Sequence, residues 1–279
     1  MENKHAYCIL AHNNLQQLCL LIKELDHPQN DIYLHLDIKF KCDIKKIKTN
    51  SAGLFLFQKF DVRWSDISQL DTEVFLYSEV LKSSIKYERI HLISGSDFPI
   101  KSQEYIHKYF LNRTEEFIDL QTDNKFINRI KYYHFFVKKR RTCKIWELLR
   151  KLLLIPQILF INRLKKCELN FAYGYNWCSL TLPAVYEIVS NIKKYRTIFL
   201  YTTSPDELYK QMILLNNNQF KIAKESSLRF VKFYKNQASP KILIIDDYNE
   251  IINSNALFAR KFDISQDPTI VYKIMNNLK

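Results

Sequence analysis

The chain has 279 residues, 47% of them hydrophobic and 25% charged, which excludes a disordered or fibrous protein and allows a full hydrophobic core. Lysine and arginine number 42 against 29 acidic residues, so the net charge is +13 and favours partners such as nucleic acid, anionic lipid or a phosphorylated substrate. A solvated basic surface without a dedicated partner is the alternative. No apolar run approaches the ~20 residues that a membrane-spanning helix needs, and the N-terminus does not match a signal peptide.

The cysteines give a second limit on the class of protein. They form no CxxC pair, and no histidine cluster stands beside them at metal-ligand spacing. Several lie in apolar runs, where a free cysteine behaves as a small hydrophobic residue. We therefore expect reduced thiols in a cytoplasmic compartment. The six are Cys8, Cys19, Cys42, Cys143, Cys167 and Cys178.

The first hundred residues alternate between strand and helix patterns. This alternation predicts βαβ units and a doubly wound α/β sheet. Asn13 or Asn14 is expected to cap the first helix. No glycine-rich phosphate loop is present, so if a nucleotide binds, Asp37 after the second strand is the natural partner for a base or ribose, unless it is a helix cap or surface ion pair. The predicted strands are 6–11, 31–38, 54–57 and 89–93, and the predicted helices are 15–25 and 71–84.

A polar turn follows the strand at 89–93. It reads Ser94-Gly95-Ser96-Asp97, and its glycine is one of only three in the chain. Glycine permits backbone conformations and close approaches that other residues resist, and Pro99 stiffens the backbone that follows. Ligands bind at the carboxyl ends of strands in open α/β sheets, so this loop is a candidate site. An ordinary strand-to-helix turn with Asp97 as a local cap is the alternative.

The middle of the chain combines basic and aromatic residues. After a predicted helix at 103–111 and a strand at 117–120, a basic aromatic segment leads into helical patterns over 145–154 and on to 161. A cationic helix with an apolar face suits an anionic bilayer surface, although core packing explains its leucines equally well. The segment also suits single-stranded nucleic acid, but no nucleic-acid motif accompanies it. We interpret about 136–170 as an embellishment of a single domain.

Two further motifs lie in the second half. Gly174 opens a loop that enters a strand, and a helix is expected from Pro183. Ser204-Pro205-Asp206-Glu207 precedes a helix over 207–215, and helix capping alone accounts for these four residues. A last apolar strand is predicted at 242–245.

Five segments, taken in order, resemble the core-2/I-branching N-acetylglucosaminyltransferases and the related peptide xylosyltransferases. The resemblance implies a GT-A type, Rossmann-like mixed sheet flanked by helices. It also implies an inverting transferase that works without a divalent metal. The sequence agrees with this, since Asp37 is followed by Ile38 and Lys39 instead of completing an Asp-x-Asp motif, and Asp246-Asp247 comes too late in the chain. The segments are His-Leu-Asp at 35–37, Ile-Ser-Gly-Ser-Asp-Phe-Pro-Ile-Lys at 93–101, Gly-Tyr-Asn-Trp-Cys-Ser-Leu-Thr at 174–181, Ser-Pro-Asp-Glu at 204–207 and Leu-Phe-Ala-Arg-Lys-Phe-Asp at 257–263.

The resemblance also implies roles for individual residues. Glu207 matches the general base that takes a proton from the acceptor hydroxyl. Lys261 and, more loosely, Lys241 neutralise the leaving diphosphate in place of a metal. The remaining matches are Asp37 for the uridine, Arg63 and Trp64 for the donor side, Ser94, Gly95, Ser96 and Asp97 for the floor of the site, and Asp119 and Trp177 for the acceptor.

The expected reaction moves a sugar from a UDP-sugar to a hydroxyl of a glycan or lipid-linked glycan. UDP-N-acetylglucosamine is the first donor we expect and UDP-xylose the second. Because the sequence lacks the anchor, stem and disulfide pattern of the eukaryotic members, we expect a bacterial enzyme of surface polysaccharide synthesis. We place it in the cytoplasm, at the inner face of the membrane, with no nucleic-acid partner. A non-catalytic basic module that binds anionic membrane or nucleic acid is the alternative.

Overall fold

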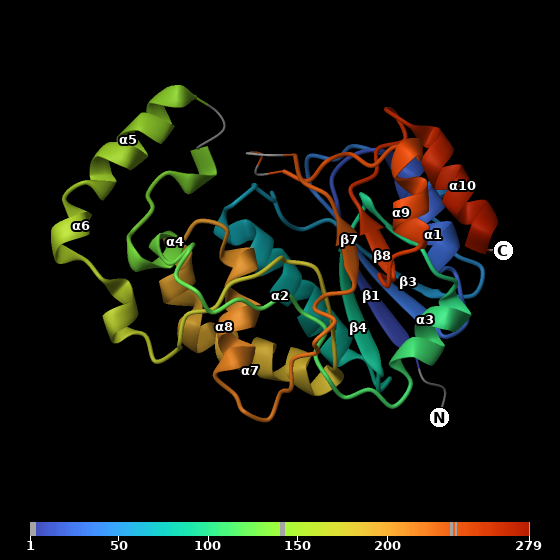
Figure 1. The fold of residues 1–279 in the computed structure, drawn as a ribbon, viewed down its shortest axis with the longest axis horizontal. Coiled ribbons are helices and arrows are strands. Elements are labelled where there is room, and N and C mark those ends of the chain that lie inside the picture. The colour runs from blue at the N-terminus through green and yellow to red at the C-terminus, as the bar shows by residue number, and fades with distance from the viewer. Residues whose placement is uncertain (1–3, 140–142, 235–236, 238, 279) are drawn as a thin grey trace.

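A mixed five-stranded sheet lies at the centre of the computed structural model, which describes residues 4–139, 143–234, 237 and 239–278 (Figure 1). The strand order is β3-β2-β1-β4-β6, with the first four strands parallel and β6 antiparallel to β4. A smaller sheet with the order β5-β8-β7 lies beside it. The strands are β1 His5–Ala11, β2 Asn30–Leu36, β3 Gly53–Phe57, β4 Arg89–Ser94, β5 Asp97–Pro99, β6 Cys178–Leu180, β7 Arg229–Val231 and β8 Phe258–Arg260.

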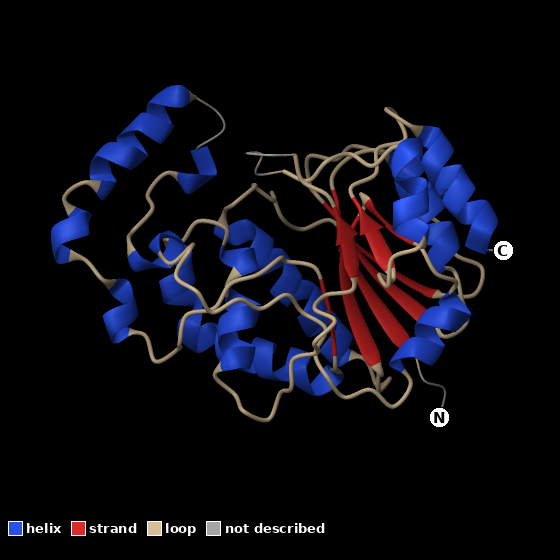
Figure 2. Ribbon diagram, viewed as in Figure 1, coloured by secondary structure: helices blue, strands red, loops and turns tan. Residues whose placement is uncertain are grey.

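Helices cover both faces of the large sheet (Figure 2). One hydrophobic core includes side chains of α1, α3 and α10, and the other includes side chains of α2, α7 and α8. This arrangement confirms the predicted α/β fold with a mixed sheet between helices. The helices are α1 Leu15–Leu25, α2 Ile67–Lys82, α3 Gln103–Phe110, α4 Asn128–Lys131, α5 Lys144–Leu154, α6 Gln157–Phe160, α7 Leu182–Leu200, α8 Tyr209–Leu215, α9 Tyr248–Ile252 and α10 Pro268–Leu278.

The predictions for the first hundred residues agree closely with the structure. Strands are found at all four expected places, and α1 occupies the predicted 15–25. Asn14 is the cap: its backbone is left-handed with φ 53°, and its side chain accepts a hydrogen bond from the Gln17 amide. The helix expected at 71–84 begins one turn earlier, because Asp66 caps it through the Ser68 amide.

Three predictions beyond the first hundred residues were wrong. Residues 117–120 contain no strand, and Phe117 makes only an isolated bridge to Ser179. Residues 242–245 also lack a strand, although the Leu243 amide donates to the Lys261 carbonyl at 2.8 Å. Ser204 does not cap a helix through its side chain, and Glu207 lies in a 3-10 turn, 205–207, that precedes α8. These short segments take their shape from distant partners instead of local patterns.

Other observations bear on the compartment and the membrane. All six cysteines lie in the described ranges and are free thiols. Within those ranges, no helix is both long enough and apolar enough to cross a bilayer.

Buried histidines form a cluster between the large sheet and α3. His91 is joined to His5 by a 3.1 Å contact between ring nitrogens and to the Ser179 hydroxyl at 2.8 Å. Burial lowers the pKa of His5 and His91 well below the usual value, and it lowers the pKa of His107 and of His35, a residue of β2, to about 4. These side chains are therefore neutral in the folded protein near pH 6.

We predict that acid destabilises the fold through these histidines. Below pH ~6.5 the unfolded chain binds protons that the folded chain does not, so the free energy of unfolding falls as the pH decreases from about 6.5 to about 4. Urea unfolding at pH 7, 6 and 5 measures this. His107→Gln should make the decline shallower, because glutamine does not titrate. Equal stability at pH 7 and 5, or the same decline in the variant, would contradict the explanation.

Candidate functional site

The candidate site forms where the parallel strands β1, β2 and β4 end. The strand register aligns Ala11 with Leu36 and Leu10 with Ser94, so the loops that follow these strands begin side by side. Backbone hydrogen bonds continue the pairing, from Asp37 to Ala11 and from Gly95 to Leu10, each 2.9 Å long. The topology therefore brings Asp37 and the 94–97 loop to one edge of the sheet.

Asp97 shapes the 94–97 loop from inside. Its fully buried carboxylate accepts from the Ser94 amide at 2.7 Å and from the Ser94 hydroxyl at 3.1 Å, and this hydroxyl accepts from the Ser96 amide. Gly95 packs closely against β1, since a Cβ there would lie 3.0 Å from the Ala11 Cβ. Asp97 therefore acts as the local cap that the sequence allowed. The loop that it fixes also lies at the ligand edge of the sheet.

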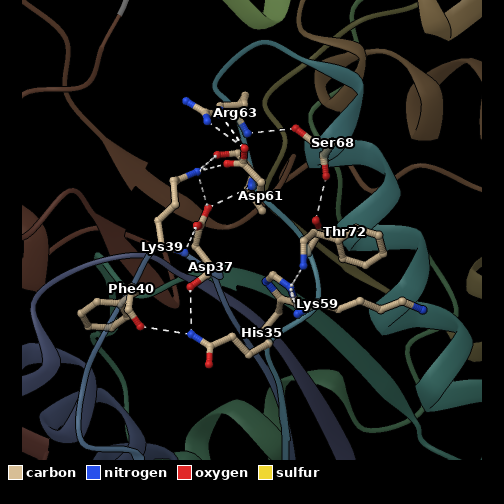
Figure 3. A network of polar contacts seen from close by, with 12 residues as sticks. His35, Asp37, Lys39, Phe40, Lys59, Asp61, Arg63, Ser68 and Thr72 are labelled. Atoms are coloured by element: carbon tan, nitrogen blue, oxygen red, sulfur yellow. Dashed lines mark hydrogen bonds and ion pairs between the residues drawn. The ribbon is translucent and has the colours of Figure 1, made fainter.

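A network of charges surrounds Asp37 (Figure 3). The carboxylate accepts from the Lys39 amide at 2.8 Å and from the Val62 amide at 2.9 Å. The Lys39 ammonium bridges two carboxylates, contacting Asp37 at 3.0 Å and Asp61. Sequence reasoning treated Lys39 only as a departure from a metal-binding motif, although its position two residues after Asp37 was a usable signal.

The predicted donor-side residues follow this network directly. Arg63 is held by Asp61 through two hydrogen bonds of 2.9 and 2.8 Å, and Trp64 is 41% exposed. The next residue, Ser65, contacts Ser204 through their hydroxyls at 3.0 Å. The donor-side segment is therefore joined to the turn that carries Glu207.

Glu207 lies in a turn whose backbone is fixed at both ends. Ser204 adopts a left-handed conformation with φ 49°, and the Glu207 carbonyl accepts from the Gly174 amide at 3.0 Å. Its carboxylate is 35% exposed and pairs with Arg129 of α4 at 2.5 Å. Sequence reasoning did not single out Arg129, which lies in the basic aromatic segment.

A buried ion pair supports this turn from behind. Glu73 and Lys210 have fully buried side chains 2.6 Å apart, and the Lys210 ammonium also donates to Asn176 at 2.5 Å and to the Asp206 carbonyl at 3.1 Å. Asp206 is buried, and burial together with Glu207 and Glu73 raises the pKa of its carboxyl well above the usual value. Asp206 is thus a buried neighbour of Glu207, while Glu207 alone of the two reaches solvent.

The predicted acceptor residues lie next to this turn. Asp119 accepts from the Tyr175 amide at 2.9 Å, and a Cβ at Gly174 would lie 1.8 Å from the Asp119 carbonyl oxygen, so only glycine fits. Asp119 and Glu207 both raise the pKa of Tyr175, although burial is the larger cause. Asp119, Tyr175 and Glu207 therefore belong to one cluster.

Arg260 joins that cluster to the 94–97 loop. Its guanidinium lies over the Trp177 ring at 4.4 Å and pairs with Asp97 at 3.4 Å, without hydrogen-bond geometry. Burial lowers the pKa of Arg260, an effect that Asp97 and Glu207 oppose. Sequence reasoning missed this arginine, although it directly precedes Lys261.

Of the two predicted phosphate-binding lysines, Lys261 directly follows β8. Lys241 lies beside Lys232, the residue after β7, because its amide donates to the Lys232 carbonyl at 2.8 Å. Lys241 is paired with Asp247 through contacts of 2.9 and 2.8 Å. Lys261 is half-buried. Burial lowers the pKa of His12, the nearby Lys261 lowers it further, and Asp37 raises it. Lys261 and Asp37 therefore both lie near His12, which follows β1. Across the part of the chain that the structure describes, no group of three or more His, Cys, Asp or Glu side chains is placed to hold a metal ion.

Comparison with known proteins gives the family. A family model described as "Core-2/I-Branching enzyme" matches residues 5–252. Two relatives named beta-1,3-galactosyl-O-glycosyl-glycoprotein beta-1,6-N-acetylglucosaminyltransferase 4, from Danio rerio and Mus musculus, are 26% and 28% identical over 102 residues, which is 35% of this chain. A Bovine herpesvirus 4 enzyme of the same name, without the number, is 26% identical over 102 residues.

These local matches cover 24%, 22% and 23% of the relatives' own lengths. The family model covers a far larger part of this chain, and its range includes every predicted site residue except Lys261. Because the match extends over residues 5–252, the chain belongs to the Core-2/I-Branching enzyme family.

Proposed function

We propose that the protein is an inverting glycosyltransferase that moves a sugar from a UDP-sugar to a hydroxyl of a glycan acceptor. The observation that carries the proposal is the partly exposed Glu207 carboxylate, fixed by its turn and by Arg129. Through Ser204 and Ser65, this turn is joined to the segment around Asp37, Lys39 and Arg63. The names of the relatives support N-acetylglucosamine as the sugar, and UDP-xylose is the alternative donor.

Glu207 has the properties that a general base needs. In an inverting displacement, the acceptor hydroxyl attacks the anomeric carbon as the nucleotide leaves from the opposite face, and one carboxylate takes the hydroxyl proton. Arg129 donates a charge-assisted hydrogen bond to one oxygen, Oε2, which orients the carboxylate. Asp206 is buried and is not suited to this role.

Fixed cations supply the charge that a leaving diphosphate requires. We propose that Lys261 and Lys241 contact the phosphates and that no divalent metal takes part. The Lys39 ammonium supports this, because it already lies between the carboxylates of Asp37 and Asp61 at the ligand edge. Arg63 adds a further cation beside Lys39, since both pair with Asp61. Lysine and arginine are common phosphate ligands in proteins.

The acceptor is proposed to lie over Trp177, Tyr175 and Asp119. Tyr175 is 46% exposed and stacks on Phe233, and the loop of Gly174 holds it beside Glu207. We propose a glycan or lipid-linked glycan of bacterial surface polysaccharide as the acceptor. The free cysteines fit a reducing, cytoplasmic compartment.

We predict that a UDP-sugar stabilises the protein against heat. A ligand at ~100 times its dissociation constant stabilises by ~2.7 kcal/mol, which a thermal-shift screen resolves. UDP-N-acetylglucosamine should give a larger shift than UDP-xylose. Lys261→Ala should reduce the shift, while Lys221→Ala, an exposed lysine elsewhere, should not. A screen in which no UDP-sugar raises the melting temperature would overturn the proposed donor class.

Glu207→Gln should reduce kcat by about 10²- to 10⁴-fold, because the amide cannot accept the proton. Donor binding should persist, so the UDP-sugar thermal shift should remain. Glu225→Gln is a matched control, since Glu225 also pairs with an arginine, Arg113, at 2.6 Å. Both variants are assayed for transfer from the donor found in the screen. Full activity in Glu207→Gln would rule out the assigned base.

Activity should survive removal of divalent ions. If lysines neutralise the diphosphate, an assay in excess EDTA should give the same rate as an assay with magnesium or manganese. Loss of activity in EDTA and its recovery with manganese would contradict the proposal that lysines neutralise the diphosphate without a metal. The same assay on Lys261→Ala should show a raised KM for the donor, a lowered kcat, or both.

A further inference from the structure

The pair α5 and α6 lies outside the packed body of the protein. Figure 1 shows the two helices at the far left, separated from the sheet by α2, α4 and α8. None of their described side chains takes part in either hydrophobic core. This arrangement settles one alternative left by the sequence, because packing into a core does not explain the leucines of 145–160.

The face of α5 and α6 that points inward is polar. Arg150 is 9% exposed and contacts the ring of His134 at 3.1 Å and the carboxylate of Glu147 at 2.7 Å. Gln157 is 8% exposed, and its amide bonds to both backbone groups of Tyr133. A surface helix of a globular protein normally buries its apolar side and exposes its polar side. Here the orientation is reversed.

The outward face is an apolar stripe. It follows the i, i+3, i+7 spacing of one helix side, from Ile145 through Leu148 to Leu152, and continues into α6. Leu159 and Phe160 are 79% and 82% exposed, which exceeds every other large hydrophobic side chain described. Large exposed apolar patches on soluble proteins mark sites of contact with a protein or a membrane. The stripe and its continuation consist of Ile145, Leu148, Leu152, Ile155, Ile158, Leu159 and Phe160.

The charge around the stripe indicates what covers it. Between residues 128 and 167 the sequence has twelve lysines and arginines and a single acidic residue, Glu147. This segment contributes +11 of the net +13, so the rest of the chain is nearly neutral. Lys144 and Lys151 are exposed on the same helix as the stripe. Apolar side chains flanked by lysines are typical of helices that lie in the interface of an anionic bilayer.

We propose that the face formed by α5 and α6 docks on an anionic lipid bilayer, with the stripe inserted among the acyl chains and the lysines on the headgroups. The segment is tied to the site by backbone contacts. The His134 amide donates to the Tyr201 carbonyl at 2.8 Å, and the Thr203 amide donates to the Arg129 carbonyl at 3.2 Å. Docking therefore holds the Glu207 turn at a fixed place relative to the membrane surface.

Vesicle co-sedimentation tests this proposal without any assay of catalysis, so its result is independent of the proposed function. The full chain should sediment with vesicles of phosphatidylcholine and phosphatidylglycerol and stay in solution with phosphatidylcholine alone. The double variant Leu159→Ser/Phe160→Ser should bind at least tenfold more weakly. The double variant Lys144→Gln/Lys151→Gln should bind more weakly and show a smaller dependence on salt.

Tyr186→Ser is the matched control, because Tyr186 of α7 is 64% exposed and carries an aromatic ring outside the stripe. It should bind vesicles as the unchanged protein does. All variants replace exposed side chains, and circular dichroism checks that each is folded. The proposal is wrong if the unchanged protein ignores anionic vesicles or if the Leu159→Ser/Phe160→Ser variant binds them equally well. A dimer that this double variant dissociates, with no vesicle binding, would assign the face to a second copy instead.

Discussion

The buried ion pair between Glu73 and Lys210 holds together the segments on which the site depends. Glu73 lies on α2 and Lys210 on α8, and the ammonium also reaches Asn176 in the Gly174 loop and the carbonyl of Asp206. One lysine thus fixes a helix, a loop and the Glu207 turn relative to one another. Removing one partner of such a pair typically costs ~3–5 kcal/mol, because the other charge is left buried and unpaired. The turn that carries the partly exposed Glu207 carboxylate is therefore supported from behind by buried charges.

Nearly every charged side chain at the ligand edge already has a protein partner. The Lys39 ammonium contacts two carboxylates, Arg63 pairs with Asp61, and Lys241 pairs with Asp247. A bound diphosphate would compete with these carboxylates for the cations. Such competition favours a ligand with more than one negative charge, since a single carboxylate gains little by replacing another. The ion pairs also keep the cations in place before a donor arrives, which lowers the entropic cost of binding.

The hydrophobic residues occupy two different kinds of position in the structure. In the sheet and its covering helices they fill two cores, and in α5 and α6 they face outward while Arg150 and Gln157 face inward. The basic charge follows the same division, since the segment 128–167 holds almost all of the net excess. The same segment supplies Arg129, the partner of Glu207. One basic segment therefore contains both the ion-pair partner of Glu207 and the outward-facing apolar stripe.

The alternation of patterns in the first hundred residues determined the strands, the helices and their order, because each element there follows its own local periodicity. The position of Asp37 and Ser94 at a common edge also followed, since parallel strands end on one side of a sheet. The resemblance over five motifs determined the family, and it did so without any knowledge of the contacts between them.

Only the tertiary structure decided the rest. The strands β5, β7 and β8 have three residues each, and such short segments become strands through their partners. The Glu207 turn depends on the Ser65–Ser204 contact across 139 residues of sequence, which no local pattern contains. The sequence showed that the helix after Lys144 has two different faces. Which face turns outward was set by the packing of Arg150 against His134 and of Gln157 against Tyr133, contacts that exist only in the folded chain.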